Sequence, residues 1–94
     1  LMALNPYQGN FWGQYGLLYM KEGNHEEARS SFEIARFFSP EDPLPYYLMA
    51  LSYASKEKKG PLRLCSEEGL LLAKKNNLDS VWKGRFLPLM ELAN

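Results

Sequence analysis

The stretch that decides the fold is residues 12–40, WGQYGLLYMKEGNHEEARSSFEIARFFSP. Gly23-Asn24 and Ser39-Pro40 divide it into segments of helical length, and neither segment shows the period-two alternation of a strand. Further breaks of the same kind lie at Asn5-Pro6, Gly60-Pro61 and Asn76-Asn77-Leu78-Asp79. The pattern therefore predicts an all-α protein.

Apolar and small residues recur at helical spacing within these segments. Trp12, Gly16 and Tyr19 fall on one face of the first segment, and Ala28 and Phe32 fall on one face of the second. The small Gly16 and Ala28 permit a close approach of the two backbones. Aromatic residues make up 14% of the chain, and we assign most of them to packing between helices. This assignment covers Trp12, Tyr15, Tyr19, Phe32, Tyr46 and Tyr53.

Several residues predict where helices begin, end or weaken. Asn24 is expected to cap the second helix, and Asp42 is expected to cap the third, with Pro43 in its first turn. Gly60 is expected to end the third helix in a left-handed conformation. Gly69 and Pro88 interrupt later helices, where we expect a weak spot and a bend or a shortened end.

A constant sequence offset relates the two halves of the chain. Proline stands at positions 6 and 40 (40 − 6 = 34), and the same offset relates Trp12 to Tyr46. The spacing from Trp12 to Pro40 resembles the tetratricopeptide repeat, a helix–turn–helix unit of about 34 residues. The resemblance implies an all-α, TPR-like helix–turn–helix solenoid of about two repeats plus a C-terminal capping helix.

The expected division treats residues 1–94 as one domain and as a piece of a longer protein. Its parts are the end of a preceding helix (1–5), a first repeat (7–40), a second, degenerate repeat (42–76) and a capping helix (79–93). The glycine expected at position 57 is Glu57, so a short insertion of a few residues is expected there.

Composition excludes several function classes. Eleven Lys and Arg balance eleven Asp and Glu, which disfavours a nucleic-acid-binding face. One cysteine and one histidine cannot build a structural zinc site, and no apolar run approaches the roughly 18 residues of a membrane span. Catalytic motifs are missing, His25 suits an exposed first turn and Cys65 suits packing. We therefore expect a cytoplasmic protein that is not an enzyme and has no cofactor, metal, nucleic-acid partner or membrane insertion.

The inner helices of the two repeats carry a second apolar stripe. By the resemblance to tetratricopeptide proteins, this stripe lines a concave groove that takes a protein or peptide partner with apolar anchor residues. The expected groove residues are Asn10, Gly13, Gln14, Leu17, Met20, Leu44, Tyr47, Leu48 and Leu51. Alternatives are a structural segment of a longer TPR scaffold, a homodimerisation unit that uses the same stripe, or an accessory domain of an enzyme. The fifth helix is a further candidate to cover the stripe.

A narrower similarity concerns translocator chaperones of bacterial type III secretion, which have three such repeats. It rests on Leu4-Asn5-Pro6-Tyr7, Phe11-Trp12, Tyr15-Gly16, Gly23, Ala28, Phe32, Pro43, Ala50 and Gly69-Leu70-Leu71-Leu72-Ala73. Those chaperones hold an extended apolar client segment in their concave face. The similarity implies a secretion chaperone that masks such a segment.

Overall fold

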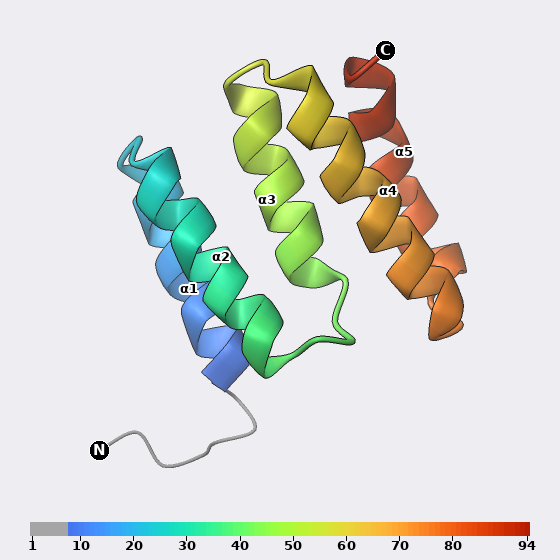
Figure 1. Ribbon diagram of the computed structural model, residues 1–94, viewed down its shortest axis with the longest axis horizontal. Coiled ribbons are helices and arrows are strands. Elements are labelled where there is room, and N and C mark those ends of the chain that lie inside the picture. The colour runs from blue at the N-terminus through green and yellow to red at the C-terminus, as the bar shows by residue number, and fades with distance from the viewer. Residues whose placement is uncertain (1–7) are drawn as a thin grey trace.

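The computed structural model describes residues 8–94, which form an all-α fold. Its helices are α1 (Gln8–Lys21), α2 (His25–Phe38), α3 (Leu44–Ser55), α4 (Lys59–Lys75) and α5 (Asp79–Leu92) (Figure 1). The all-α prediction is confirmed for these residues. The helix end expected at residues 1–5 lies outside the described residues.

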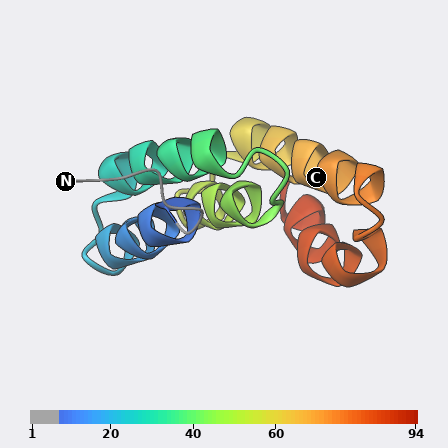
Figure 2. The same cartoon turned by 90° about the horizontal axis from the view of Figure 1, so that it is seen from below.

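The helices form two layers. Successive helices run antiparallel to one another (Figure 1). Figure 2 shows α2 and α4 in one layer and α1, α3 and α5 in the other, with α3 set back between its two neighbours so that this layer is arched. The molecule extends over 44 × 33 × 16 Å, and α3 contacts each of the other four helices.

The turns after α1, α3 and α4 close in the same way. In each turn one residue adopts a left-handed conformation: Gly23 (φ 81°), Glu57 (φ 56°) and Asn77 (φ 60°). The backbone N–H of the next residue then donates to the carbonyl five residues back, namely Asn24 to Tyr19 (2.9 Å), Lys58 to Tyr53 (3.0 Å) and Leu78 to Ala73 (2.7 Å). The prediction that Gly60 ends the third helix is therefore wrong, because Glu57 takes that conformation and Gly60 lies inside α4.

The 34-residue offset between the two halves continues across the turn between α3 and α4, so no residue is inserted there. α2 begins at His25 and α4 at Lys59, and their offset (59 − 25 = 34) equals that between Pro6 and Pro40. The buried positions Ala28, Phe32 and Ala35 of α2 correspond in this register to Leu62, Ser66 and Gly69 of α4, which are also buried. The expected insertion near Glu57 is wrong. α4 is longer than α2, with 17 residues against 14, and it gains these residues at its C-terminal end.

Of the predicted helix signals, the Asn24 cap is confirmed, since its side-chain oxygen accepts a hydrogen bond from the Glu27 backbone N–H (3.3 Å). The expectation that Asp42 caps α3 with Pro43 in its first turn is wrong by one residue, because Pro43 is the N-cap and α3 begins at Leu44. The Asp42 carboxylate still accepts a hydrogen bond from the Leu44 N–H (3.0 Å). Pro88 does not end its helix early, because α5 continues to Leu92.

Two glycines act as notches that receive aromatic rings. A Cβ atom added to Gly16 would lie 2.2 Å from the ring of Phe32, and one added to Gly69 would lie 2.3 Å from the ring of Phe86. Both rings are fully buried. Gly16 therefore sits where two helices come close, as predicted, whereas Gly69 is a packing position and not a weak spot.

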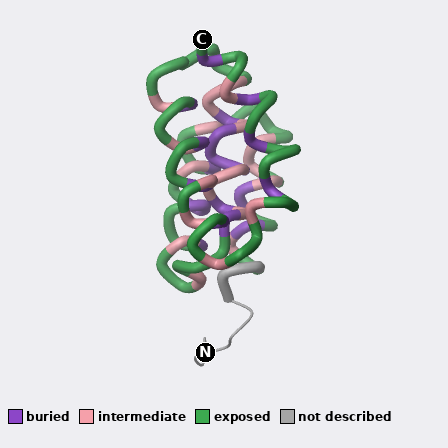
Figure 3. The backbone as a smooth tube through the Cα atoms, turned by 90° about the vertical axis from the view of Figure 1, so that its right-hand side faces the viewer, coloured by how far each residue is buried: buried purple, intermediate pink, exposed green. Residues whose placement is uncertain are grey.

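Buried positions face the space between the layers, and exposed positions surround them (Figure 3). Of the six aromatic residues assigned to packing, Phe32 is fully buried and Trp12, Tyr19, Tyr46 and Tyr53 are half-buried. Tyr15 departs from the assignment, because it is 42% exposed and stacks edge-on against Phe11, whose ring centroid lies 4.8 Å away. Its helix α1 is the first described helix of its layer.

Candidate partner-binding surface

The residues predicted to line a groove lie on α1 and α3, in the arched layer. Gly13 and Leu48 are buried, and Gln14 is exposed. The side chains of Leu17, Met20, Leu44, Tyr47 and Leu51 are half-buried. Asn10 belongs to α1, but its side chain lies outside the part of the chain that is described.

Leu17 and Met20 of α1 meet α3 rather than standing apart from it. Both side chains pack against the core cluster that contains Leu48. Gly13 lies close to the same leucine, since an added Cβ would be 4.0 Å from Leu48 Cδ1. The predicted stripe thus spans the two helices, and several of its side chains already pack into this core cluster.

The fifth helix covers part of this surface at the other side of α3. The ring of Tyr47 lies edge-on to Trp82 and Phe86 of α5, with centroid distances of 5.9 Å and 5.6 Å. Leu44 packs against the same aromatic cluster. Sequence reasoning placed these residues together but did not predict which of them α5 would contact.

Chemically, the surface offers shape and apolar contact. None of the residues predicted for it is charged, and Gln14 is its exposed polar side chain. Within residues 8–94 no group of three or more His, Cys, Asp or Glu is placed to hold a metal ion. The arrangement suits an apolar peptide segment better than a charged ligand.

His25 belongs to a polar network that joins α2 to α3. Its Nδ1 lies 3.0 Å from the hydroxyl of Ser52, which also accepts a hydrogen bond from Arg29 (3.2 Å). Burial lowers the pKa of His25, and the neighbouring cations Lys56 and Arg29 lower it further. His25, Arg29 and Lys56 border a cavity of about 430 Å³, whose other lining residues are Gly23, Asn24, Glu26 and Lys58.

Cys65 is half-buried on α4 and packs against two of the core clusters. Burial raises the pKa of its thiol to about 11, and the carboxylates of Glu68 and Glu33 add to that rise. The thiol therefore remains protonated near neutral pH, which makes it a poor nucleophile.

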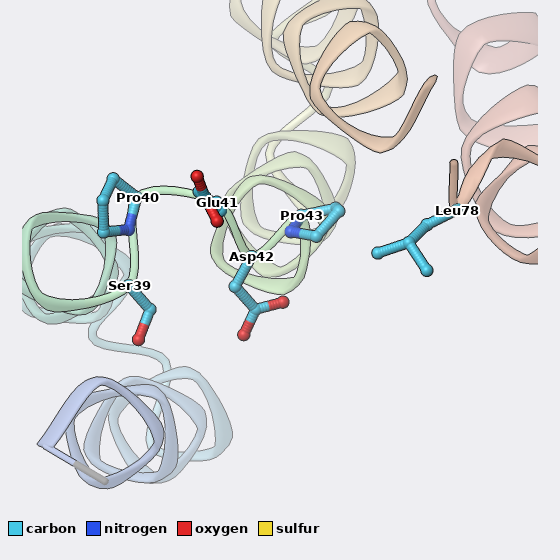
Figure 4. A pocket seen from close by; sticks show the side chains of 6 residues that line it. All are labelled: Ser39, Pro40, Glu41, Asp42, Pro43 and Leu78. Carbon is cyan, nitrogen blue, oxygen red and sulfur yellow. The ribbon is translucent and has the colours of Figure 1, made fainter. Parts of the chain in front are cut away.

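Sequence reasoning missed a cavity beside the loop between α2 and α3. It has a volume of about 540 Å³ and is lined by Ser39, Pro40, Glu41, Asp42, Pro43 and Leu78. Figure 4 shows Leu78, from the turn between α4 and α5, pointing toward Pro43 and Asp42. The sequence predicts a break between helices at Ser39-Pro40, but the contribution of Leu78 depends on tertiary structure.

A second missed feature is an apolar groove of about 290 Å³ between α4 and α5. Its lining residues are Glu67, Leu70, Leu71, Lys74, Asp79, Lys83, Leu87 and Met90, all from these two helices. On α4 the charged Glu67 and Lys74 flank Leu70 and Leu71 in sequence, whereas on α5 Asp79 and Lys83 both precede Leu87 and Met90.

Comparison of the chain with protein-family models, with curated proteins and with solved structures found no match. Across residues 8–94, each helix is too short or too polar to cross a membrane.

Proposed function

We propose that this chain is a non-catalytic protein-interaction module of the tetratricopeptide type. It binds an apolar peptide segment of a partner protein on the concave side of the α1, α3 and α5 layer. The observation that carries the proposal is the arch of this layer, with α3 recessed, together with half-buried apolar side chains on α1 and α3. Leu17, Leu44 and Leu51 supply such side chains without a charged neighbour in the predicted set.

The helix arrangement supports a repeat of this type. The turns after α1 and α3 have the same hydrogen bonds at equivalent positions of the two units, at Asn24 and at Lys58. Alternating helices occupy alternating layers, so the first helix of each unit reaches the same face (Figure 2). Such stacking of equivalent units is the basis of extended concave binding surfaces.

The partner contributes apolar anchors in this proposal. Burial of apolar surface yields about 25 cal/mol per Å², so two or three anchoring side chains are needed for measurable affinity. Because the surface carries no charge of its own, binding depends little on salt. The concrete form of the proposal is a cytoplasmic secretion chaperone that masks a hydrophobic client segment.

A fluorescence-anisotropy titration tests the proposal. The probe is a labelled, uncharged ten-residue peptide with leucine at alternate positions. We expect saturable binding that the paired substitution Leu17→Asp/Leu51→Asp weakens at least tenfold, with helicity checked by circular dichroism. The matched control is Leu18→Asp, which changes an exposed leucine of α1 outside the predicted set.

Equal affinity of the paired variant and the original chain, with helicity retained, would contradict the proposal. Should that variant lose helicity, Gln14→Arg provides the second test, because it adds bulk and charge at an exposed position of the same surface. An unchanged affinity of Gln14→Arg would then reject the concave side. Absence of any peptide binding would favour a structural segment of a longer scaffold.

A further inference from the structure

We infer that the groove between α4 and α5 is an interface at which two copies of this chain pair around a two-fold axis. None of its lining residues belongs to α1, α2 or α3, so it is separate from the surface proposed to bind peptides. Its apolar lining consists of Leu70, Leu71, Leu87 and Met90.

Two of these leucines are unusually open to solvent. Leu71 on α4 is 69% exposed, and Leu87 on α5 is 48% exposed. They stand on the two walls of one groove, so their exposed surface forms a single patch and not two isolated residues. An apolar patch with charged residues around it is typical of a protein–protein interface.

The charge pattern along α4 indicates which partner fits. Glu67, Leu70, Leu71 and Lys74 are spaced i, i+3, i+4 and i+7, so they share one stripe of the helix. A two-fold axis between Leu70 and Leu71 places α4 of a second copy antiparallel to α4 of the first, with the two stripes facing each other. Glu67 then lies opposite Lys74 of the second copy, and each leucine pair faces the other. The acidic and basic ends are about 10 Å apart along the helix.

Both charged ends of the stripe are available for such pairing. The ion pairs found within residues 11–94 are Arg36–Glu33 and Lys83–Asp79, so neither Glu67 nor Lys74 has an ion-pair partner in that part of the chain. Lys83 and Asp79 are 3.8 Å apart and flank the groove on α5. Glu67 and Lys74 are both exposed, which leaves them free to meet a neighbouring molecule.

This self-complementarity favours a second copy over an unrelated partner. A two-fold interface uses the same patch on both subunits, so it requires a patch that matches its own reversed image. The sequence Glu-x-x-Leu-Leu-x-x-Lys of α4 meets that requirement. Leu71 of each copy then enters the groove of the other copy beside Leu87, and the exposed apolar surface of both is covered.

Sedimentation velocity over a concentration series of the chain tests the interface. We expect a reversible monomer–dimer equilibrium, and Leu71→Glu should raise its dissociation constant at least tenfold. The matched control is Phe37→Glu on α2, because Phe37 is 78% exposed but belongs to a helix that does not line the groove. Circular dichroism confirms that both variants remain helical.

A charge exchange tests the antiparallel register. Glu67→Lys and Lys74→Glu should each weaken the dimer, whereas the double variant Glu67→Lys/Lys74→Glu should restore it. A chain that stays monomeric up to about 1 mM would overturn the inference. So would equal effects of Leu71→Glu and Phe37→Glu, or a double variant that is no better than the single ones. None of these failures bears on peptide binding, which uses other residues.

Discussion

At each end of the helix stack, a glycine of one helix makes room for a phenylalanine ring of the next, but the glycine lies in a different layer at the two ends. At the α1–α2 crossing the notch is Gly16 and the ring is Phe32, and at the α4–α5 crossing the notch is Gly69 and the ring is Phe86. Gly16 belongs to the arched layer, whereas Gly69 belongs to the layer of α2 and α4 (Figure 2). The glycine therefore permits close approach from either layer.

The rings have different surroundings. Phe32 joins a cluster with Ala28, Leu48 and Met49, and so ties α2 to α3. Phe86 joins Ala73 and Trp82, and its ring also meets Tyr47. Both crossings thus reach α3, which contacts every other helix. The difference teaches that the close contact is a property of each antiparallel pair and that α3 couples the two pairs.

Truncation of the two rings is expected to have the largest effect. Phe32→Ala and Phe86→Ala each leave a cavity that fixed neighbours cannot fill, so each should lower the free energy of unfolding by about 3–5 kcal/mol. Because α3 couples the crossings, both losses should appear in a single transition. Urea denaturation followed by circular dichroism measures this.

Phe37→Ala is the control for these truncations, since Phe37 is 78% exposed and its removal should change stability by only about 0.5 kcal/mol. A second unfolding transition in one ring variant and not in the other would show that the crossings are independent. That result would contradict the conclusion that α3 couples the two crossings.

Substitution of the notches should have an intermediate effect. Gly16→Ala and Gly69→Ala place a methyl group within 2.2 Å and 2.3 Å of buried rings, and such overpacking costs about 1–3 kcal/mol. The helix propensity of alanine offsets up to about 1 kcal/mol of this cost. Thermal and urea unfolding should show a net loss at both sites.

Gly84→Ala in α5 separates the two contributions. Nothing lies within 4 Å of a Cβ atom added to Gly84, so only the gain in helix propensity should remain. Should Gly16→Ala or Gly69→Ala stabilise the protein as Gly84→Ala is expected to, that glycine would not be a steric notch. Phe86→Leu combined with Gly69→Ala should recover part of the loss, because the smaller side chain leaves room for the methyl group.

The sequence predicted the first crossing and missed the second for a physical reason. Gly16 and Phe32 lie within one regular repeat pattern, so their helix faces and their closeness could be inferred together. Gly69 looked like a weak spot, because a glycine inside a helix lowers its propensity when no neighbour is known. The ring that needs the space, Phe86, lies in the next helix, beyond the turn at Asn77.

The candidate surface shows the same limit. Helical spacing sufficed to predict that Leu17 and Leu51 lie on α1 and α3 away from solvent on one side, and both are half-buried there. The groove between α4 and α5 could not be inferred, because it depends on how two helices of different length align side by side. The register error near Glu57 has a similar origin, since a non-glycine residue took a left-handed conformation at a cost that sequence alone does not reveal.

The α3–α4 pair, between the two crossings, has neither a ring nor a glycine notch at the matching positions. We therefore expect substitutions there to change stability the least. In the register that aligns α4 with α2, Ser66 of α4 takes the position of Phe32. Its hydroxyl is fully buried and has no hydrogen-bond partner among residues 8–94. Ser66→Ala removes an unsatisfied buried group, so it should raise the free energy of unfolding by about 1 kcal/mol.

Ser52 of α3 provides the opposite case. It is equally buried, but its hydroxyl meets His25 and accepts a hydrogen bond from Arg29. Ser52→Ala should therefore lower stability by about 1 kcal/mol, because it leaves both partners short of a hydrogen bond. Paired urea titrations of the two variants measure the contrast. A loss of stability in Ser66→Ala would mean that its hydroxyl is satisfied in solution, and that the middle pair is held by a polar contact where the two ends are held by rings.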